Sequence, residues 1–298
     1  MSTSESTLPA ADVSAQISRL YVYPIKSCAG VQVPSVLLTE TGLEFDRAWM
    51  LVDEDGSFVS QRELPRMALI QPQIRQYEMV LRAPGMLALH IALDAVEEPL
   101  QVKVWDDEVR AYNMGAVAAQ WFSDFLSTKE APRKLRLVRF DPEQQRLSSL
   151  KWTGGIEASN QFADGFPVLV ISEASLDGLN ERLVAAGHAP AAMERFRPNV
   201  VVSGVDAHDE DRLDEMLIAT AEGHARLKMV KPCPRCPIPN IDPATAISSP
   251  EVSDTLQGYR KVDIVGGAIA FGMNAIVLDG VDFELRVGQA AAADYRFD

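Results

Sequence analysis

Two cysteines lie three positions apart in a proline-rich segment near the end of the chain, Lys231-Pro232-Cys233-Pro234-Arg235-Cys236-Pro237-Ile238-Pro239-Asn240-Ile241-Asp242-Pro243. Because proline cannot continue a helix or a central strand, we expect a stiff loop here. This loop holds Cys236 beside the permanent positive charge of Arg235. A thiol beside cations ionises more readily, and the thiolate is the form that binds soft metals. The segment therefore indicates a thiol suited to metal ligation.

Four uses of Cys233 and Cys236 are open. A closed zinc site needs two more ligands, but the only other cysteine is Cys28, and the four histidines show no paired spacing. A dithiol redox pair normally opens a helix, which Pro237 and Pro239 oppose. The two thiols could also be buried and inert. The fourth use, which we favour, is a single-thiolate metal site with Cys236 as the ligand.

Three further clusters of polar side chains lie at the ends of expected strands. Lys26 and Ser27 follow the first strand and offer a point charge and a donor to an anionic group. Arg47 precedes one apolar strand. Arg197 precedes another, and Asn199 lies at the start of that second strand. Guanidinium suits phosphate, and an amide can pair with the edge of a heterocycle. Each cluster alone is typical of a surface turn. Together with the cysteine loop, they predict one pocket for a phosphorylated, metal-bearing heterocycle.

Charge and composition exclude several classes of function. The chain has 42 acidic and 28 basic residues, a formal net charge of −14. Such a charge disfavours nonspecific binding to nucleic acid or to an anionic membrane. Three cysteines are too few for a disulfide scaffold, which favours a reducing compartment. No run of 18 apolar residues is present, so no transmembrane helix is expected.

The N-terminal segment contains no Lys or Arg through residue 13 and does not resemble a secretory signal or a transit peptide. We expect a disordered tail over residues 1–14 and a cytoplasmic protein.

The elements that position these clusters are mostly short strands rich in β-branched and aromatic residues. One helix is expected where Val117, Trp121 and Phe125 form an apolar stripe, and another after Ser172, which is suited to cap it. The polar residues 141–165 are predicted to form a mobile connection. We expect a mixed, mainly β fold, a β-barrel-like core with added helices. The expected strands cover residues 17–23, 31–38, 48–52, 102–105 and 109–112 (a hairpin), 135–140, 166–171, 200–202, 213–218, 225–230, 268–278 and 283–287.

The clusters and their order resemble the MOSC family, in the subgroup with an N-terminal MOSC-associated β-barrel that includes the amidoxime-reducing components. The resemblance covers residues 17–287. It depends on the segments YPIKSCAG, FDRAWMLVD, SQRELPRM, FPVLVISEASL, FRPNVVVSG, PCPRC and AFGMNAIV. It implies an N-terminal β-barrel domain over residues 15–135, whose early strands pack with the second part, and a MOSC domain over residues 136–298.

The resemblance also implies a cofactor and its ligands. In that family the second cysteine of the C-x-R-C loop binds molybdenum, which corresponds to Cys236. The residues implied to bind the molybdopterin are Lys26, Ser27, Arg47, Arg197, Asn199 and Arg235. The implied reaction is the reduction of N-hydroxylated compounds (amidoximes, hydroxylamines and N-hydroxylated bases), with two electrons and two protons releasing water.

Two further expectations follow from the resemblance. The chain has no spare cysteines for an iron–sulfur cluster, so electrons must come from a separate flavoprotein, ferredoxin or cytochrome b5-like protein. The run from Pro237 to Asn240 differs from the family pattern, which leaves the substrate open. A carrier of the cofactor, or a sulfur-transfer module without turnover of its own, is the alternative to an enzyme. A zinc-stabilised β protein is a second alternative.

Overall fold

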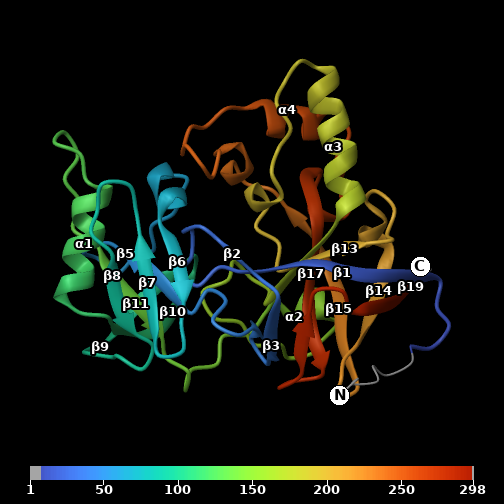
Figure 1. Cartoon of the computed structure of the whole chain (residues 1–298), viewed down its shortest axis with the longest axis horizontal. Coiled ribbons are helices and arrows are strands. Elements are labelled where there is room, and N and C mark those ends of the chain that lie inside the picture. Colours follow the sequence, from blue (N-terminus) through green and yellow to red (C-terminus); the bar gives the residue numbers. More distant parts are fainter. Residues whose placement is uncertain (1–7, 297–298) are drawn as a thin grey trace.

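The structure, a computed structural model, describes residues 8–296 and confirms the predicted mainly β fold (Figure 1). The described residues form nineteen strands and four α-helices. Half of the predicted tail, residues 1–7, lies outside the described residues, and the first strand, β1, spans Val13–Val22. None of the helices within residues 8–296 has the length and apolar character needed to cross a membrane.

Seven strands form a closed barrel, on the right in Figure 1. The ring closes because β17 (Ala268–Asp279) pairs with β12 (Val168–Ser172). Alternate side chains of these strands point inward and form an apolar core that includes Ile17, Val170 and Met216. In ring order the strands are β12 (Val168–Ser172), β13 (Val200–Ser203), β1, β19 (Ala290–Tyr295), β14 (Leu213–Ala219), β15 (His224–Pro234) and β17 (Ala268–Asp279).

A helix joins the one parallel pair of the barrel, β12 and β13. This helix, α3 (Glu173–Ala185), begins where the side chain of Ser172 accepts a hydrogen bond from the Ser175 N–H, as predicted. Its predicted apolar face is confirmed, because Leu176, Leu179 and Leu183 are buried. The helix α4 (Glu251–Gln257) lies beside α3 above the barrel (Figure 1).

A four-stranded sheet lies beside the barrel, on the left in Figure 1. Its order is β5 (Trp49–Val52), β11 (Arg136–Phe140), β10 (Asp107–Asn113) and β9 (Pro99–Val104), and the last two form the predicted hairpin. Since β11 pairs with both β10 and β5, the chain belongs to this sheet as far as Phe140, beyond the predicted domain boundary at residue 135. The first strand, β1, lies instead in the barrel.

Short elements complete the fold. The helix α1 (Ala116–Leu126) packs on the four-stranded sheet through Trp121 and Phe125, but Val117, expected on the same face, is 75% exposed. A three-stranded sheet that the sequence did not predict lies next to α1. This sheet contains β6 (Gln71–Ile74), β7 (Glu78–Arg82) and β8 (Leu89–Ala92); the remaining strands are β2 (Val31–Val33), β3 (Ser35–Thr39), β4 (Gly42–Leu43), β16 (Lys261–Val262) and β18 (Glu284–Arg286).

The predicted cysteine loop is partly a strand. β15 continues through Pro232 to Pro234, so Cys233 belongs to the strand and only Cys236 lies in the loop that follows. Proline has no N–H for the ladder, and the pairing with β17 accommodates this through register shifts, one of them between Pro232 and Pro234. The prediction of a loop from residue 231 was therefore wrong for its first four residues.

The connection over residues 141–165 contains a short helix, α2 (Leu150–Thr153), that was not expected. The buried guanidinium of Arg146 holds this segment together. It donates to Asn160 Oδ1 at 2.5 Å and to the carbonyl oxygens of Gln161 and Ala163 at 2.8 and 2.7 Å. These bonds fix the end of the segment next to the residues described below.

Candidate functional site

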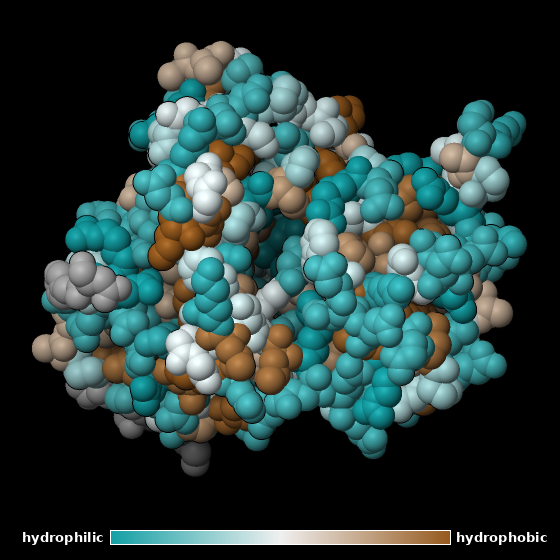
Figure 2. Space-filling model, turned by 180° about the vertical axis from the view of Figure 1, so that it is seen from behind, coloured by the Kyte–Doolittle hydropathy of each residue, from teal (hydrophilic) through white to brown (hydrophobic). Residues whose placement is uncertain are grey.

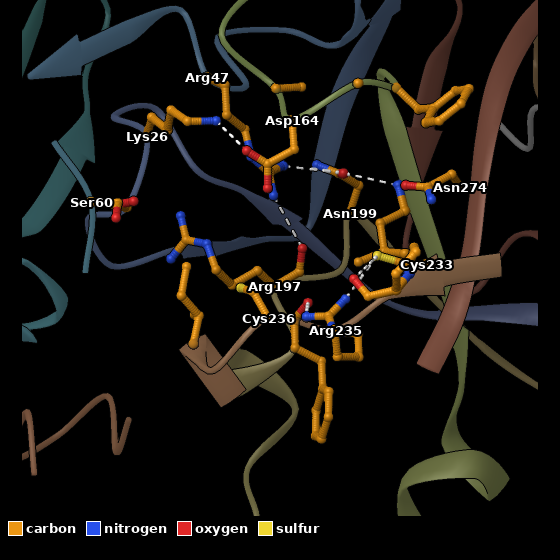
Figure 3. A pocket seen from close by; sticks show the side chains of 18 of the residues that line it. Lys26, Arg47, Ser60, Asp164, Arg197, Asn199, Cys233, Arg235, Cys236 and Asn274 are labelled. Carbon is orange, nitrogen blue, oxygen red and sulfur yellow. Dashed lines mark hydrogen bonds and ion pairs between the residues drawn. The ribbon is translucent and has the colours of Figure 1, made fainter. Parts of the chain in front are cut away.

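One pocket brings together all seven residues that the sequence indicated, from four separate segments. Figure 3 labels all of them except Ser27. The segments are the chain after β1, the turn before β5, the turn before β13 and the loop after β15. Figure 2 shows the opposite face of the molecule from Figure 1, hollowed near its middle, with hydrophilic residues around the hollow. The seven residues are Lys26, Ser27, Arg47, Arg197, Asn199, Arg235 and Cys236.

Three of the pocket residues have left-handed backbone conformations. The φ angles are 68° at Ser27, 50° at Arg47 and 58° at Arg197. Residues other than glycine rarely adopt such angles, and each one costs free energy unless the surrounding structure holds it. The strained turns let three different strand ends direct their side chains into one pocket.

Lys26 is buried, and its ammonium group donates to the Phe162 carbonyl oxygen at 2.8 Å. It also forms an ion pair with Asp164, whose side chain is 69% exposed. Burial lowers the pKa of Lys26, and the Asp164 carboxylate opposes that shift. The ammonium therefore offers a positive charge at a fixed point, paired with a carboxylate that also accepts the Trp105 indole N–H.

Arg47 and Asn199 form a network that closes one side of the pocket (Figure 3). Arg47 Nη1 donates to Asp46 Oδ2 at 2.5 Å and to Asn199 Oδ1 at 3.1 Å. Asn199 Oδ1 also accepts the Leu169 N–H, and Asn199 Nδ2 donates to the Tyr21 carbonyl oxygen. Because the amide is bonded to the protein on both sides, Asn199 positions Arg47 here. Its predicted contact with a cofactor stays a prediction.

The Arg197 guanidinium has a hydrogen-bond donor that no described residue satisfies. Its Nη1 donates to the Cys28 carbonyl oxygen at 2.6 Å, while its buried Nη2 has no partner among the described residues. Arg197 and Arg47 both stack on the ring of Tyr23, at 4.3 and 4.4 Å. Burial, and after it the nearby charge of Arg47, lowers the pKa of Arg197 to about 10, so the group remains cationic at neutral pH. A buried donor without an acceptor is costly, and a ligand oxygen would satisfy it.

The cysteine loop brings a third guanidinium to the pocket. Arg235 Nη1 donates to Cys233 Sγ at 3.0 Å, and Nη2 donates to the Phe196 carbonyl oxygen at 2.7 Å. The buried Nε of Arg235 has no partner within residues 8–296. Cys236 lines the pocket as a free thiol, whereas burial raises the pKa of the Cys28 thiol to about 12. Cys28 is thus poorly suited to act as a thiolate.

Several residues line the pocket that the sequence did not single out. Asp164 ends the connection over residues 141–165, where no periodic pattern marks it. Ser60 and Arg62 belong to the SQRELPRM segment and Asn274 to AFGMNAIV, so the resemblance contained them without assigning them a role. The additional side chains include Phe58, Ser60, Arg62, Asp164 and Asn274.

The balance of charge in the pocket is positive, although the chain is acidic. Five cationic side chains and one carboxylate line it. Lys26 and Arg47 have carboxylate partners, but no carboxylate of the described residues pairs with the guanidiniums of the other three, Arg62, Arg197 and Arg235. Unpartnered cations and orphaned donors around a free thiol fit an anionic group that carries a soft metal.

A zinc site receives no support from the geometry. No group of three or more His, Cys, Asp or Glu side chains that could hold a metal ion occurs within residues 8–296. A metal here would have Cys236 as its protein ligand and take its other ligands from elsewhere. This arrangement fits a metal delivered as part of a cofactor, with the guanidinium groups on its anionic part.

The barrel, the adjoining sheets and the basic pocket with its free thiol define a two-part, mainly β protein. The model of the MOSC N-terminal beta barrel domain matches residues 14–129, and that of the MOSC domain matches residues 157–291. The chain is 36% identical over 256 residues to mitochondrial amidoxime reducing component 2 of Bos taurus, covering 83% of this chain and 73% of that protein. The chain therefore belongs to the family of MOSC-domain proteins with an N-terminal MOSC β-barrel domain.

Two human proteins show the range of these relatives. Mitochondrial amidoxime-reducing component 1 of Homo sapiens is 34% identical over 256 residues, which cover 83% of this chain and 72% of that protein. Molybdenum cofactor sulfurase of Homo sapiens is 29% identical over 265 residues, but these cover only 29% of its length. The similarity thus extends along both parts of the chain.

Proposed function

We propose that this protein is a molybdenum cofactor-dependent oxidoreductase that reduces N-hydroxylated compounds such as amidoximes, hydroxylamines and N-hydroxylated bases. One observation carries the proposal: the free thiol of Cys236 shares a pocket with three guanidiniums that have no carboxylate partner within residues 8–296. The names of the relatives support it, since they are amidoxime-reducing components and a molybdenum cofactor sulfurase.

Different pocket residues would bind different parts of the cofactor. Cys236 would bind the molybdenum through its thiolate, next to Arg235. Arg197 Nη2 and Arg235 Nε would donate to the anionic oxygens of the molybdopterin, because they are buried and lack partners among the described residues. When bound, the molybdenum centre would supply the two-electron chemistry that removes oxygen from nitrogen.

The remaining pocket residues would position these groups. Arg47 is fixed by Asp46 and Asn199, so its charge adds to the field in the pocket without needing to move. Lys26 and Ser27 would contact the anionic end of the cofactor. For Lys26 this requires the carboxylate of Asp164, which also accepts the Trp105 indole N–H, to share the ammonium with the cofactor or to leave it.

A carrier of the cofactor or a sulfur-transfer module would use the same pocket without turnover. Steady-state reduction of benzamidoxime by cofactor-loaded protein, with an artificial electron donor, separates the two. The reductase proposal requires turnover that depends on Cys236, with Cys233→Ala retaining most of it. A loaded protein that gives no benzamidine would favour the carrier.

Three further points stay predictions. Electrons are expected from a separate flavoprotein, ferredoxin or cytochrome b5-like protein. A cytoplasmic location is expected as well. For the domains, we propose that the N-terminal unit extends to about residue 140, because β11 pairs with β5 and β10.

A further inference from the structure

A guanidinium at the rim of the pocket is held between two aromatic rings. The Arg62 guanidinium lies 4.6 Å from the ring of Trp105 and 6.0 Å from the ring of Phe58. The two rings are 5.0 Å apart and tilted by 59°. Arg62 Nε also donates to Ser60 Oγ at 3.2 Å. Stacking on aromatic faces orients the guanidinium and still leaves its N–H groups free for a ligand.

The backbone of Trp105 has a left-handed conformation that bulky residues rarely adopt. It lies in the tight turn between β9 and β10 with a φ angle of 56°, where a bulky residue is rare. It is also 44% exposed, and its indole N–H donates to Asp164 Oδ1 at 3.1 Å. Strain of this kind persists where the surrounding structure enforces it, and it concentrates at binding sites. The ring of Trp105, at the tip of this hairpin, thus lies against the Arg62 guanidinium.

Arg62 has no anionic partner of its own. Within residues 8–296, neither Nη1 nor Nη2 of Arg62 makes a hydrogen bond or an ion pair. Lys26 Nζ lies 5.4 Å from the same Phe58 ring, but this second cation is paired with the Asp164 carboxylate, which leaves Arg62 as the unpaired cation at this end of the pocket. The unpaired Arg62 guanidinium, together with the buried hydroxyl of Ser60 to which its Nε is bonded, forms a suitable site for an oxyanion.

We propose that Arg62 and Ser60 form a phosphate-binding subsite at the rim of the pocket, held in place by Trp105 and Phe58. The phosphate could be that of the cofactor or one carried by a substrate. The choice between these two sources rests on the proposed function, whereas the subsite itself rests on the geometry alone. The N-terminal sheets would then supply part of the pocket's specificity.

Calorimetry with inorganic phosphate on folded, cofactor-free protein tests the subsite directly. Because a hydrogen bond to a charged group contributes substantially, we expect Arg62→Gln to weaken phosphate binding about tenfold or more. Arg62→Lys should recover part of this affinity. Arg66→Ala is the matched control, since it removes the same charge four positions away, where Arg66 stacks on Phe125 instead. Equal phosphate affinity in the wild type and Arg62→Gln would overturn the proposal.

Two measurements on protein expressed with the cofactor then identify the source. A several-fold loss of bound pterin in Arg62→Gln, but not in Arg66→Ala, assigns the phosphate to the cofactor. The phosphate belongs instead to the substrate if Arg62→Gln keeps its pterin but its KM for a phosphorylated N-hydroxynucleoside rises about tenfold. In that case the KM for the unphosphorylated compound should not change. If neither the pterin content nor the KM for the phosphorylated compound changes, the subsite is wrong. If the wild type reduces neither compound, the reductase proposal fails, while calorimetry and pterin content still decide the subsite.

Discussion

Arg47 Nη2 donates to the backbone carbonyl oxygen of Arg197 at 3.2 Å. This bond joins the turn before β5 to the turn before β13, and both arginines have left-handed backbone angles. The Arg47 guanidinium therefore helps to hold the strained conformation that directs Arg197 into the pocket. A contact between two cationic residues is stable here because Asp46 and the Tyr23 ring offset their charges.

Replacing Arg197 by alanine is expected to lower the cofactor content about tenfold or more. The reason is that Arg197 Nη2 is a buried donor without a partner within the described residues, so its best acceptor is a ligand oxygen. Pterin released on denaturation and measured by fluorescence, per mole of folded protein, checks this. Arg195→Ala is the control, because Arg195 instead pairs with Asp242. Full pterin content in Arg197→Ala would contradict the assignment.

Tyr23 is predicted to act through its ring and not through its hydroxyl. The hydroxyl is buried and has no hydrogen-bond partner among residues 8–296, whereas the ring contacts both Arg47 and Arg197. Tyr23→Phe should keep the wild-type pterin content and change the free energy of unfolding by less than about 1 kcal/mol. Tyr23→Leu should lose pterin several-fold, because each cation–π contact contributes about 0.5–2 kcal/mol. Similar pterin losses in both variants would show that the hydroxyl matters.

Gly272 is expected to be essential for closing the barrel. It lies on β17 with a φ angle of 79°, and a Cβ atom would come within 2.5 Å of Ile171 Cγ1 and 2.8 Å of the Val170 carbonyl oxygen. Gly272→Ala should lower the free energy of unfolding by about 2–4 kcal/mol, from overpacking and backbone strain together. Gly154→Ala, at a φ angle of 68° with open space around it, should lose only about 1 kcal/mol. Equal losses in urea denaturation would refute the close approach.

His208 is predicted to make stability depend on pH. Burial, followed by the charges of Arg260 and Arg182, lowers the pKa of His208 to about 4 from 6.5. Between about pH 6.5 and pH 4 the unfolded chain binds a proton at His208 that the folded protein does not. The contribution of His208 to the free energy of unfolding is therefore fully present above about pH 6.5 and is lost as the pH drops toward 4. At about 1.4 kcal/mol per pKa unit, the loss amounts to at most about 3 kcal/mol.

The difference between the wild type and His208→Asn isolates this effect from that of other titrating groups. Asparagine does not titrate, and it tolerates the left-handed backbone of residue 208. Unfolding free energies at pH 7 and pH 5 should show a smaller acid loss in His208→Asn than in the wild type. The exposed His188 provides the control, His188→Asn. An unchanged acid loss in His208→Asn would rule out this role for His208.

The sequence predicted the parts of the fold that local patterns specify. The hairpin of β9 and β10 and the helix after Ser172 follow from turn residues, alternation and capping, and both are present. The sheet of β6 to β8 was missed because its strands are short and carry Pro72 and several polar residues. The strand β15 was cut short in the prediction because bulges, which no local rule reveals, accommodate its prolines.

The sequence predicted those site residues that lie at the ends of expected strands. Cations, an amide and a thiol at four strand ends suggested one pocket, and the same seven residues line one pocket. Arg62 and Asp164 were missed because they lie in irregular segments whose path depends on tertiary contacts. For Asp164 these contacts come from Arg146, and for Arg62 from Trp105 on a hairpin that is distant in sequence.

The central claim is that the thiolate of Cys236 binds molybdenum, and elemental analysis of protein purified from a host that makes the cofactor tests it most directly. We expect close to one molybdenum per chain in the wild type and in Cys233→Ala, almost none in Cys236→Ala, and no stoichiometric zinc in any of them. Equal molybdenum in Cys236→Ala and the wild type, or zinc in place of molybdenum, would contradict the account.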